Sequence, residues 1–182
     1  MPALGLVETA GIAAGVALAD RMVKAAQVNL IQATTICSGR YMIQISGDQA
    51  AVEAALAVVA DSPARIIGQY LLPQVSDEVL TILRRPAGVR LGQAIAVIES
   101  RTVISGIAGA DAAVKAAAVG LARLVTGQGI NGKSYCVLCG ELSSVEAGVR
   151  AAVDVIANNL IDTTILAAPD QAVLHELTRV LG

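Results

Sequence analysis

The 182-residue chain contains no Phe and no Trp, and three Tyr residues are its only aromatic side chains. It therefore has no row of aromatic rings on which nucleic-acid bases could stack. A surplus of positive charge is absent as well, because the formal net charge is −2. These two absences argue against a nucleic-acid partner.

Long apolar runs are also absent, although hydrophobic residues make up 55% of the chain and the mean hydropathy is +0.66. The longest candidate, residues 10–19, ends at Asp20, short of the ~18 residues that a membrane span needs. No membrane partner is therefore expected. We attribute the apolar surplus to surface buried between subunits, so the chain is predicted to oligomerise.

Cysteine is scarce, and histidine occurs once. Three cysteines without a secretory signal before Ala3 predict a reducing, cytoplasmic location. Cys136 and Cys139 lie three residues apart in a predicted strand, so they point to opposite faces and are interpreted as buried packing residues. No Ser, Cys or acid has triad-like spacing toward His175. We assign no catalytic residue and expect the protein not to be an enzyme.

The chain does contain an internal duplication. Residues 94–121 repeat residues 3–30 at an offset of 91, with 12 identities in 28 positions. Beyond Gly39 the offset becomes 93, because the second copy has two extra residues between about Gln32 and Gly39. The repeat predicts two domains, at 1–83 and 93–182, joined by a linker at 84–92 that carries Pro, Gly and Arg.

Both copies have the same succession of apolar patterns. In the first copy, strands are expected at 3–8, 28–36, 40–46 and 65–72, and helices at 11–26, 49–60 and 76–83. One apolar stripe on the first of these helices is formed by Ile12, Val16, Ala19, Val23 and Ala26. In the second copy, strands are expected at 94–99, 120–126, 133–139 and 160–167, and helices at 103–118, 143–157 and 170–181. Each domain is thus predicted to be β-α-β-β-α-β-α, an α/β fold of the α+β kind, with helices on one face of a four-stranded antiparallel sheet.

Three motifs connect this order to a known family: A-L-G-L-V-E-T at the start, A-D-R-M-V-K-A-A at the end of the first helix, and G-R-Y before the third strand. They resemble the bacterial microcompartment shell domain, and two copies in one chain resemble its tandem-domain subclass. The resemblance implies an unpermuted element order and a homotrimer that mimics a hexamer, placed in a microcompartment shell inside the cytoplasm. It also implies other shell proteins, both hexamers and pentamers, and enclosed redox enzymes as partners.

In that family, the loop between the second and third strands surrounds a central pore. The resemblance makes seven residues pore-lining here: Ile36, Ser38 and Gly39 in the first copy, and Gly129, Ile130, Asn131 and Gly132 in the second. The second loop is two residues longer and rich in Gly, so it can fold back and leave room for a cluster.

Cys37 is the candidate metal ligand. Its segment T-I-C-S-G resembles the T-I-C-P-G loop of the propanediol-utilisation type, in which one cysteine per subunit binds a [4Fe-4S] cluster on the threefold axis. The resemblance implies that three copies of Cys37 bind such a cluster, for electron transfer or cluster delivery. Ser38 replaces the proline of that motif, and its hydroxyl is able to donate a hydrogen bond to a cluster sulfide. A pore without metal, through which metabolites pass, remains the alternative, and an unrelated oligomeric small-molecule-binding protein is a third possibility.

Two further pairs recur in both copies. Lys24 and Lys115 end the first helix of each repeat, four residues after an aspartate, which is the spacing of a solvated helical ion pair. The resemblance instead places these lysines at the edge between tiles. Glu8 and Glu99 end the first strand of each repeat, and each is predicted to pair with the N-terminus of the helix that follows it.

Overall fold

The computed structural model describes residues 2–84 and 93–178, so the predicted linker lies outside the described residues except for Arg84, which is the last residue of a helix. The predicted order of elements is confirmed in both repeats. The first repeat comprises β1 Ala3–Thr9, α1 Ile12–Ala25, β2 Asn29–Ile36, β3 Arg40–Gly47, α2 Gln49–Ala57, β4 Ile66–Leu72 and α3 Asp77–Arg84. The second comprises β5 Ala94–Ser100, α4 Val103–Ala116, β6 Gly120–Thr126, β7 Ser134–Gly140, α5 Leu142–Ile156, β8 Leu160–Leu166 and α6 Gln171–Thr178.

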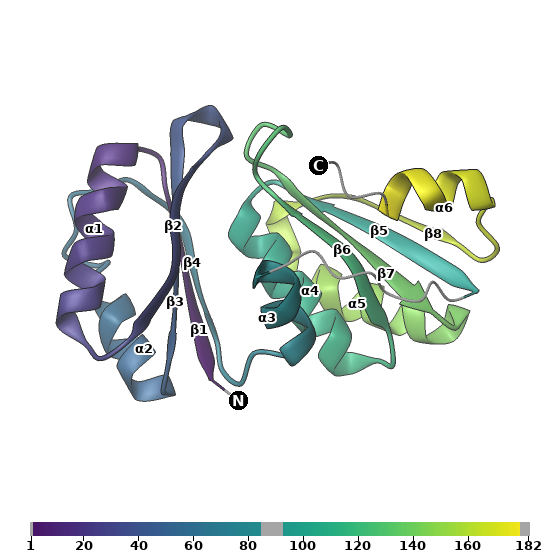
Figure 1. Cartoon of the computed structure of the whole chain (residues 1–182), viewed down its shortest axis with the longest axis horizontal. Helices are drawn as coiled ribbons and strands as arrows, with labels where there is room; N and C mark the ends of the chain where they lie inside the picture. The colour runs from purple at the N-terminus through teal and green to yellow at the C-terminus, as the bar shows by residue number, and fades with distance from the viewer. Residues whose placement is uncertain (1, 85–92, 179–182) are drawn as a thin grey trace. The chain divides into compact units, whose positions relative to one another are not determined.

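Each repeat forms one antiparallel four-stranded sheet (Figure 1). The strand orders are β2-β3-β1-β4 and β6-β7-β5-β8, so the first strand of each repeat lies between the third and the fourth. The two orders are identical once the repeats are aligned, which confirms a duplicated α+β domain with the predicted β-α-β-β-α-β-α order in each copy. No helix in the described ranges 2–84 and 93–178 is both long and apolar enough to cross a membrane.

The compact units do not coincide with the two repeats. The first unit contains the described residues up to Val75 together with 102–104 and 127–132. The second contains the described residues of 76–101 and 105–126 and those from Lys133 onward. Two short pieces of the second repeat therefore belong to the first unit, and α3 of the first repeat belongs to the second.

In the first unit, α1 and α2 pack on one face of the sheet (Figure 1). Because side chains alternate along a strand, Val7 of β1 and its register partner Ile43 of β3 both point into this core. Val52 and Leu56 of α2 are buried against them, as the helical spacing predicts.

Most of the apolar stripe predicted for α1 does not face this core, and of its five residues only Ala19 is buried there. Ile12, Val16 and Val23 are 42%, 50% and 37% exposed, and the residues that α1 buries are Gly15, Leu18, Ala19 and Met22. Gly15 allows the helix to approach the sheet, because a Cβ there would lie 2.7 Å from Tyr41 Cβ. Most of the stripe is thus left on the outside of the chain.

In the second unit, helices cover both faces of the sheet, so the prediction of helices on one face is wrong here (Figure 1). Leu138 of β7 meets α5 at Gly148, whereas its neighbour Val137 packs on the other face against Leu174 of α6. The side-chain alternation of the strand explains why consecutive residues meet different helices.

Helix α3 begins as its sequence predicts. The Ser76 hydroxyl accepts a hydrogen bond from the Val79 N–H at 3.4 Å, which is the arrangement of an N-cap. The Ser76 N–H in turn donates to Asp111 Oδ1 of α4 at 2.8 Å. This second contact anchors α3 in the second unit.

Candidate functional site: the Cys37 loop

The segment between β2 and β3 turns within three residues. Cys37–Gly39 forms a single 3₁₀ turn in which Ser38 and Gly39 have φ angles of 68° and 69°. Ile36 before the turn is buried, Cys37 is partly exposed, and Ser38 and Gly39 are exposed. The cysteine is therefore held at an accessible position by a tight turn.

The loop of the second repeat contacts this turn directly. Residues 127–132 belong to the first compact unit, and the Cys37 N–H donates to the Gly127 carbonyl at 3.4 Å. The Gly129 N–H donates to Cys37 Sγ at 3.2 Å. Gly132, at φ 75°, lies so close that a Cβ there would be 3.1 Å from the Cys37 carbonyl oxygen. The longer loop of the second repeat thus packs on Cys37.

Backbone amides lower the pKa of the Cys37 thiol. The largest effect comes from the Gly129 N–H, desolvation opposes it, and the N–H groups of Asn131, Gly132 and Ile130 add to it. Four consecutive amides thus stabilise negative charge on one sulfur. Because the thiolate is the form that binds metal and attacks electrophiles, Cys37 is suited to both.

The Ser38 side chain is hydrogen-bonded to Asn131, within the first compact unit. Its hydroxyl donates to Asn131 Oδ1 in a short hydrogen bond and lies 3.4 Å from the Asn131 carbonyl. Proline fixes φ near −65°, so the φ of 68° at Ser38 is a conformation that the proline of the resembling T-I-C-P-G loop cannot adopt. The replacement therefore changes the shape of the loop as well as its polarity.

A buried acidic residue lies near this turn. Glu8 is fully buried, and its Oε1 accepts a hydrogen bond from Arg40 Nη1 at 2.9 Å. Its Oε2 accepts one from the Val103 N–H at 3.1 Å, and the Ile104 N–H contributes a further one. Burial raises the pKa of Glu8, while Arg40 and the two amides act in the opposite direction.

Glu8 thus pairs with a helix N-terminus, but not with that of α1, which follows it in the sequence. It caps α4 of the second repeat, so the predicted partner is wrong. Sequence reasoning also missed Arg40. The recurrence of an acid at Glu8 and Glu99 and of a base at Arg40 and Lys133 was the available signal.

The two lysines that end the first helices have different surroundings. Lys24 pairs with Asp20 at 2.7 Å, and both side chains are exposed. Lys115 pairs with Asp111 at 2.5 Å, but Asp111 is buried and also accepts from the Ser76 N–H. The two repeats therefore present this ion pair differently, although both lysine side chains reach the surface.

The remaining candidates, Cys136, Cys139 and His175, are not arranged to bind a metal ion or to act in catalysis. Cys136 and Cys139 are both buried in β7, and burial raises the pKa of the Cys136 thiol to about 12. His175 is exposed on α6, 3.5 Å from Glu176. Within residues 2–84 and 93–178, no three His, Cys, Asp or Glu side chains are grouped to hold a metal ion.

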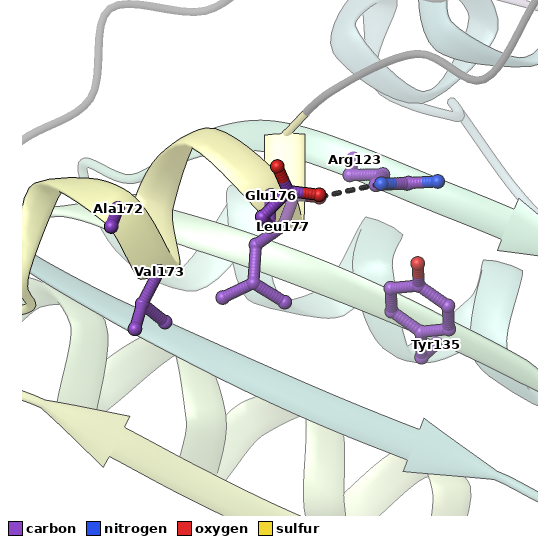
Figure 2. Close-up of a pocket in the computed structure, with 6 residues that line it drawn as sticks. All are labelled: Arg123, Tyr135, Ala172, Val173, Glu176 and Leu177. Atoms are coloured by element: carbon purple, nitrogen blue, oxygen red, sulfur yellow. Dashed lines mark hydrogen bonds between the residues drawn. The ribbon is translucent and has the colours of Figure 1, made fainter.

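Figure 2 shows a pocket between α6 and the second sheet. It has a volume of about 450 Å³ and is lined by Arg123, Tyr135, Ala172, Val173, Glu176 and Leu177. The Arg123 guanidinium donates to the Leu177 carbonyl at 2.7 Å and lies 5.7 Å from the centre of the Tyr135 ring. The arginine is thus used to attach α6 to the sheet.

Comparisons with known proteins agree with the duplicated fold. A family model described as "BMC domain" matches residues 3–75 and 94–169. The bacterial microcompartment shell protein PduT of Citrobacter freundii is 35% identical over 151 residues, which cover 82% of each chain. The carboxysome shell protein CcmK2 of Thermosynechococcus vestitus is 43% identical over 70 residues, 38% of this chain and 69% of that protein.

Solved structures show the same likeness. A crystal structure of a microcompartment protein from Desulfitobacterium hafniense matches with a TM-score of 0.83 and 35% identity, over 96% of this chain and 99% of that one. A fused permuted hexameric shell protein matches with a TM-score of 0.63 at 21% identity, over 86% of this chain and 84% of its own, a likeness of fold alone.

Proposed function

Because the chain belongs to the BMC domain family of bacterial microcompartment shell proteins and carries the domain twice, we propose that it builds a microcompartment shell as a homotrimeric tile of pseudohexameric shape. The tile is structural rather than enzymatic, and its neighbours are other shell proteins, both hexamers and pentamers. Lys24 and Lys115 lie at the edges where tiles meet.

The centre of the tile is lined by Ile36–Gly39 and Gly129–Gly132. The observation that supports this is the packing of both loops in one compact unit, where the second loop supplies the Gly129 N–H to Cys37. Loops of both repeats would then alternate around the threefold axis. Exposed polar groups at Ser38 and Asn131 would face the pore.

We further propose that three copies of Cys37 hold one [4Fe-4S] cluster on that axis. The residues fit such a group, because the thiol is partly exposed, its pKa is lowered, and amide N–H groups surround its sulfur. N–H donors of this kind are among the factors that set cluster potentials. A bound cluster would supply one-electron transfer, to enclosed redox enzymes or across the shell.

Symmetry is necessary for this site. A cubane cluster takes about four thiolate ligands, whereas this loop supplies one, and the described residues contain no group of three metal-ligating side chains. In each copy, Gly129 and its neighbours stabilise the thiolate, and the turn at Ser38 fixes the direction of Cys37. Three chains would together present three such sulfurs.

The test combines particle size with spectroscopy. Protein produced without oxygen and with ample iron should sediment as three chains and show the visible absorption of a [4Fe-4S] cluster. Cys37→Ala should abolish that absorption and keep the trimer, whereas Cys136→Ala should keep both, because Cys136 lies buried in β7. A colourless wild-type trimer would refute the cluster and favour the metal-free metabolite pore. A monomer would refute the tile.

A further inference from the structure

The starting observation is that a carboxylate of one repeat caps a helix of the other. Glu8, at the end of β1, accepts hydrogen bonds from the N–H groups of Val103 and Ile104, in the first turn of α4. Arg40 holds the second carboxylate oxygen at 2.9 Å. A carboxylate at this position satisfies amides that have no partner within the helix and interacts favourably with the helix dipole.

The duplication supplies every part of this arrangement a second time. Glu99 corresponds to Glu8, Lys133 to Arg40, and Ile12 to Val103. Lys133 Nζ lies 3.0 Å from Glu99 Oε1, and among the described residues it is the sole hydrogen-bond partner of that carboxylate. Glu99 is 36% exposed, whereas Glu8 is fully buried. The second carboxylate is therefore oriented by its base but caps no helix in the same chain.

The complementary helix end is also unoccupied in the described chain. Helix α1 starts after Gly11 without a hydrogen-bonding side-chain cap and without an acidic residue in its first turn. Its first turn is exposed at Ile12 and Ala13, whereas the corresponding Val103 and Ile104 are buried. Each chain thus forms one capping contact, between Glu8 and α4. It also holds the two parts of a second one, Glu99 and the N-terminus of α1, which do not meet in the described chain.

The apolar surface shows the same difference between the repeats. Ile12 and Val16 are 42% and 50% exposed on α1, whereas their counterparts Val103 and Ile107 on α4 are both fully buried. Full exposure of a large aliphatic side chain costs about 1.5–3 kcal/mol relative to full burial, and leaving these two side chains half exposed costs part of that. The stripe of α1 lies next to the uncapped helix end, so one partner can cover both.

We propose that the partner is a second copy of this chain: Glu99 of one copy caps the N-terminus of α1 in the next copy, and the contact buries Ile12 and Val16. The two halves are different segments of the chain, so the contact between copies is head-to-tail, and in the proposed trimer it closes into a ring. The inference rests on the proposed trimer, in which three caps are formed within chains by Glu8 and three between chains by Glu99.

Hydrogen exchange of single amides tests this contact in the intact protein. In wild-type trimers, the amides of Ile12 and Ala13 should be protected. Glu99→Gln should reduce that protection about tenfold, since hydrogen bonds to charged groups are the strong ones. The amides of Val103 and Ile104 should keep theirs. Glu146→Gln removes an exposed carboxylate from α5 and should change neither pair.

Sedimentation of a second variant gives an independent readout. Ile12→Asp places an acid in the first turn of α1, which by itself stabilises a helix. In the proposed contact, however, its negative charge would repel the carboxylate of Glu99 from the next copy. We expect the concentration at which trimers dissociate to rise about tenfold or more. If wild-type trimers form but neither variant changes protection or dissociation, the contact is refuted and the tile stands. If the wild-type chain is a monomer, both are refuted.

Discussion

Glu8→Gln measures what the buried carboxylate contributes to the stability of the first unit. The wild-type side chain uses one oxygen for Arg40, at 2.9 Å, and the other for the Val103 N–H, at 3.1 Å. Glutamine keeps the size of the side chain but has a single acceptor oxygen. Its amide NH₂ must then face either the guanidinium or the helix amides, and both of these are donors.

Either the helix amides or Arg40 therefore loses its hydrogen bond to residue 8, which costs about 1–3 kcal/mol when the donor is buried. The neutral amide avoids the desolvation that the carboxylate undergoes, and this offsets part of the loss. We expect the free energy of unfolding to fall by about 2 kcal/mol. In a chain of this size each kcal/mol shifts Tm by about 2–4 °C, so Tm should fall by about 4–8 °C.

The pH dependence has a definite sign. Burial raises the pKa of Glu8 above its ordinary value of 4.5, so the folded chain binds this proton more tightly than the unfolded chain. The stability gained from protonation is fully present below pH 4.5 and is lost as the pH rises through the raised pKa. The difference in free energy of unfolding between wild type and Glu8→Gln should therefore narrow as the pH increases through this window.

Thermal and urea unfolding at equal chain concentration provide the measurement, because association makes Tm depend on concentration. Glu146→Gln on α5 serves as the control for loss of an exposed carboxylate. If Glu8→Gln lowers Tm no more than this control does, the pairing of Glu8 with Arg40 and with the first turn of α4 does not stabilise the chain.

Two further predictions concern the cysteines and α1. In metal-free protein near pH 7.5, iodoacetamide should alkylate Cys37 and leave Cys136 intact, because amides lower the pKa of the first thiol and burial raises that of the second to about 12; equal rates in peptide mass spectra would contradict this. Gly15→Ala should lower the free energy of unfolding by about 1–2 kcal/mol, since the clash 2.7 Å from Tyr41 outweighs the gain in helix propensity. Ala17→Gly on the exposed side of α1 calibrates that propensity term, and a stabilised Gly15→Ala variant would refute the predicted clash.

The proposed central position of the Cys37 turn rests on a family resemblance, whereas its surroundings are given by the fold. Cys37 and residues 129–132 are 92 or more positions apart in the sequence, so no local pattern brings the Gly129 N–H to the sulfur. The left-handed backbone conformation of Ser38 cannot be predicted from the sequence either, because serine is common in loops of many conformations.

Residue patterns within short stretches of the sequence determined the helices and strands. Strand and helix order, the cap at Ser76 and the burial of Cys136 and Cys139 all followed from residue spacing within a few turns of chain. The duplication followed from identities at a fixed offset. These features depend on neighbouring residues, which the sequence shows directly.

Tertiary structure alone decided which face of α1 is buried and which helix Glu8 caps. Periodicity locates a stripe such as Ile12 and Val16, but the neighbour that packs against a helix determines whether that stripe lies inside. A carboxylate at a strand end can reach any helix start within hydrogen-bonding distance, and the fold places α4 there instead of α1. The repeat supplies the residues for this contact twice, and among the described residues the contact is formed once, by Glu8.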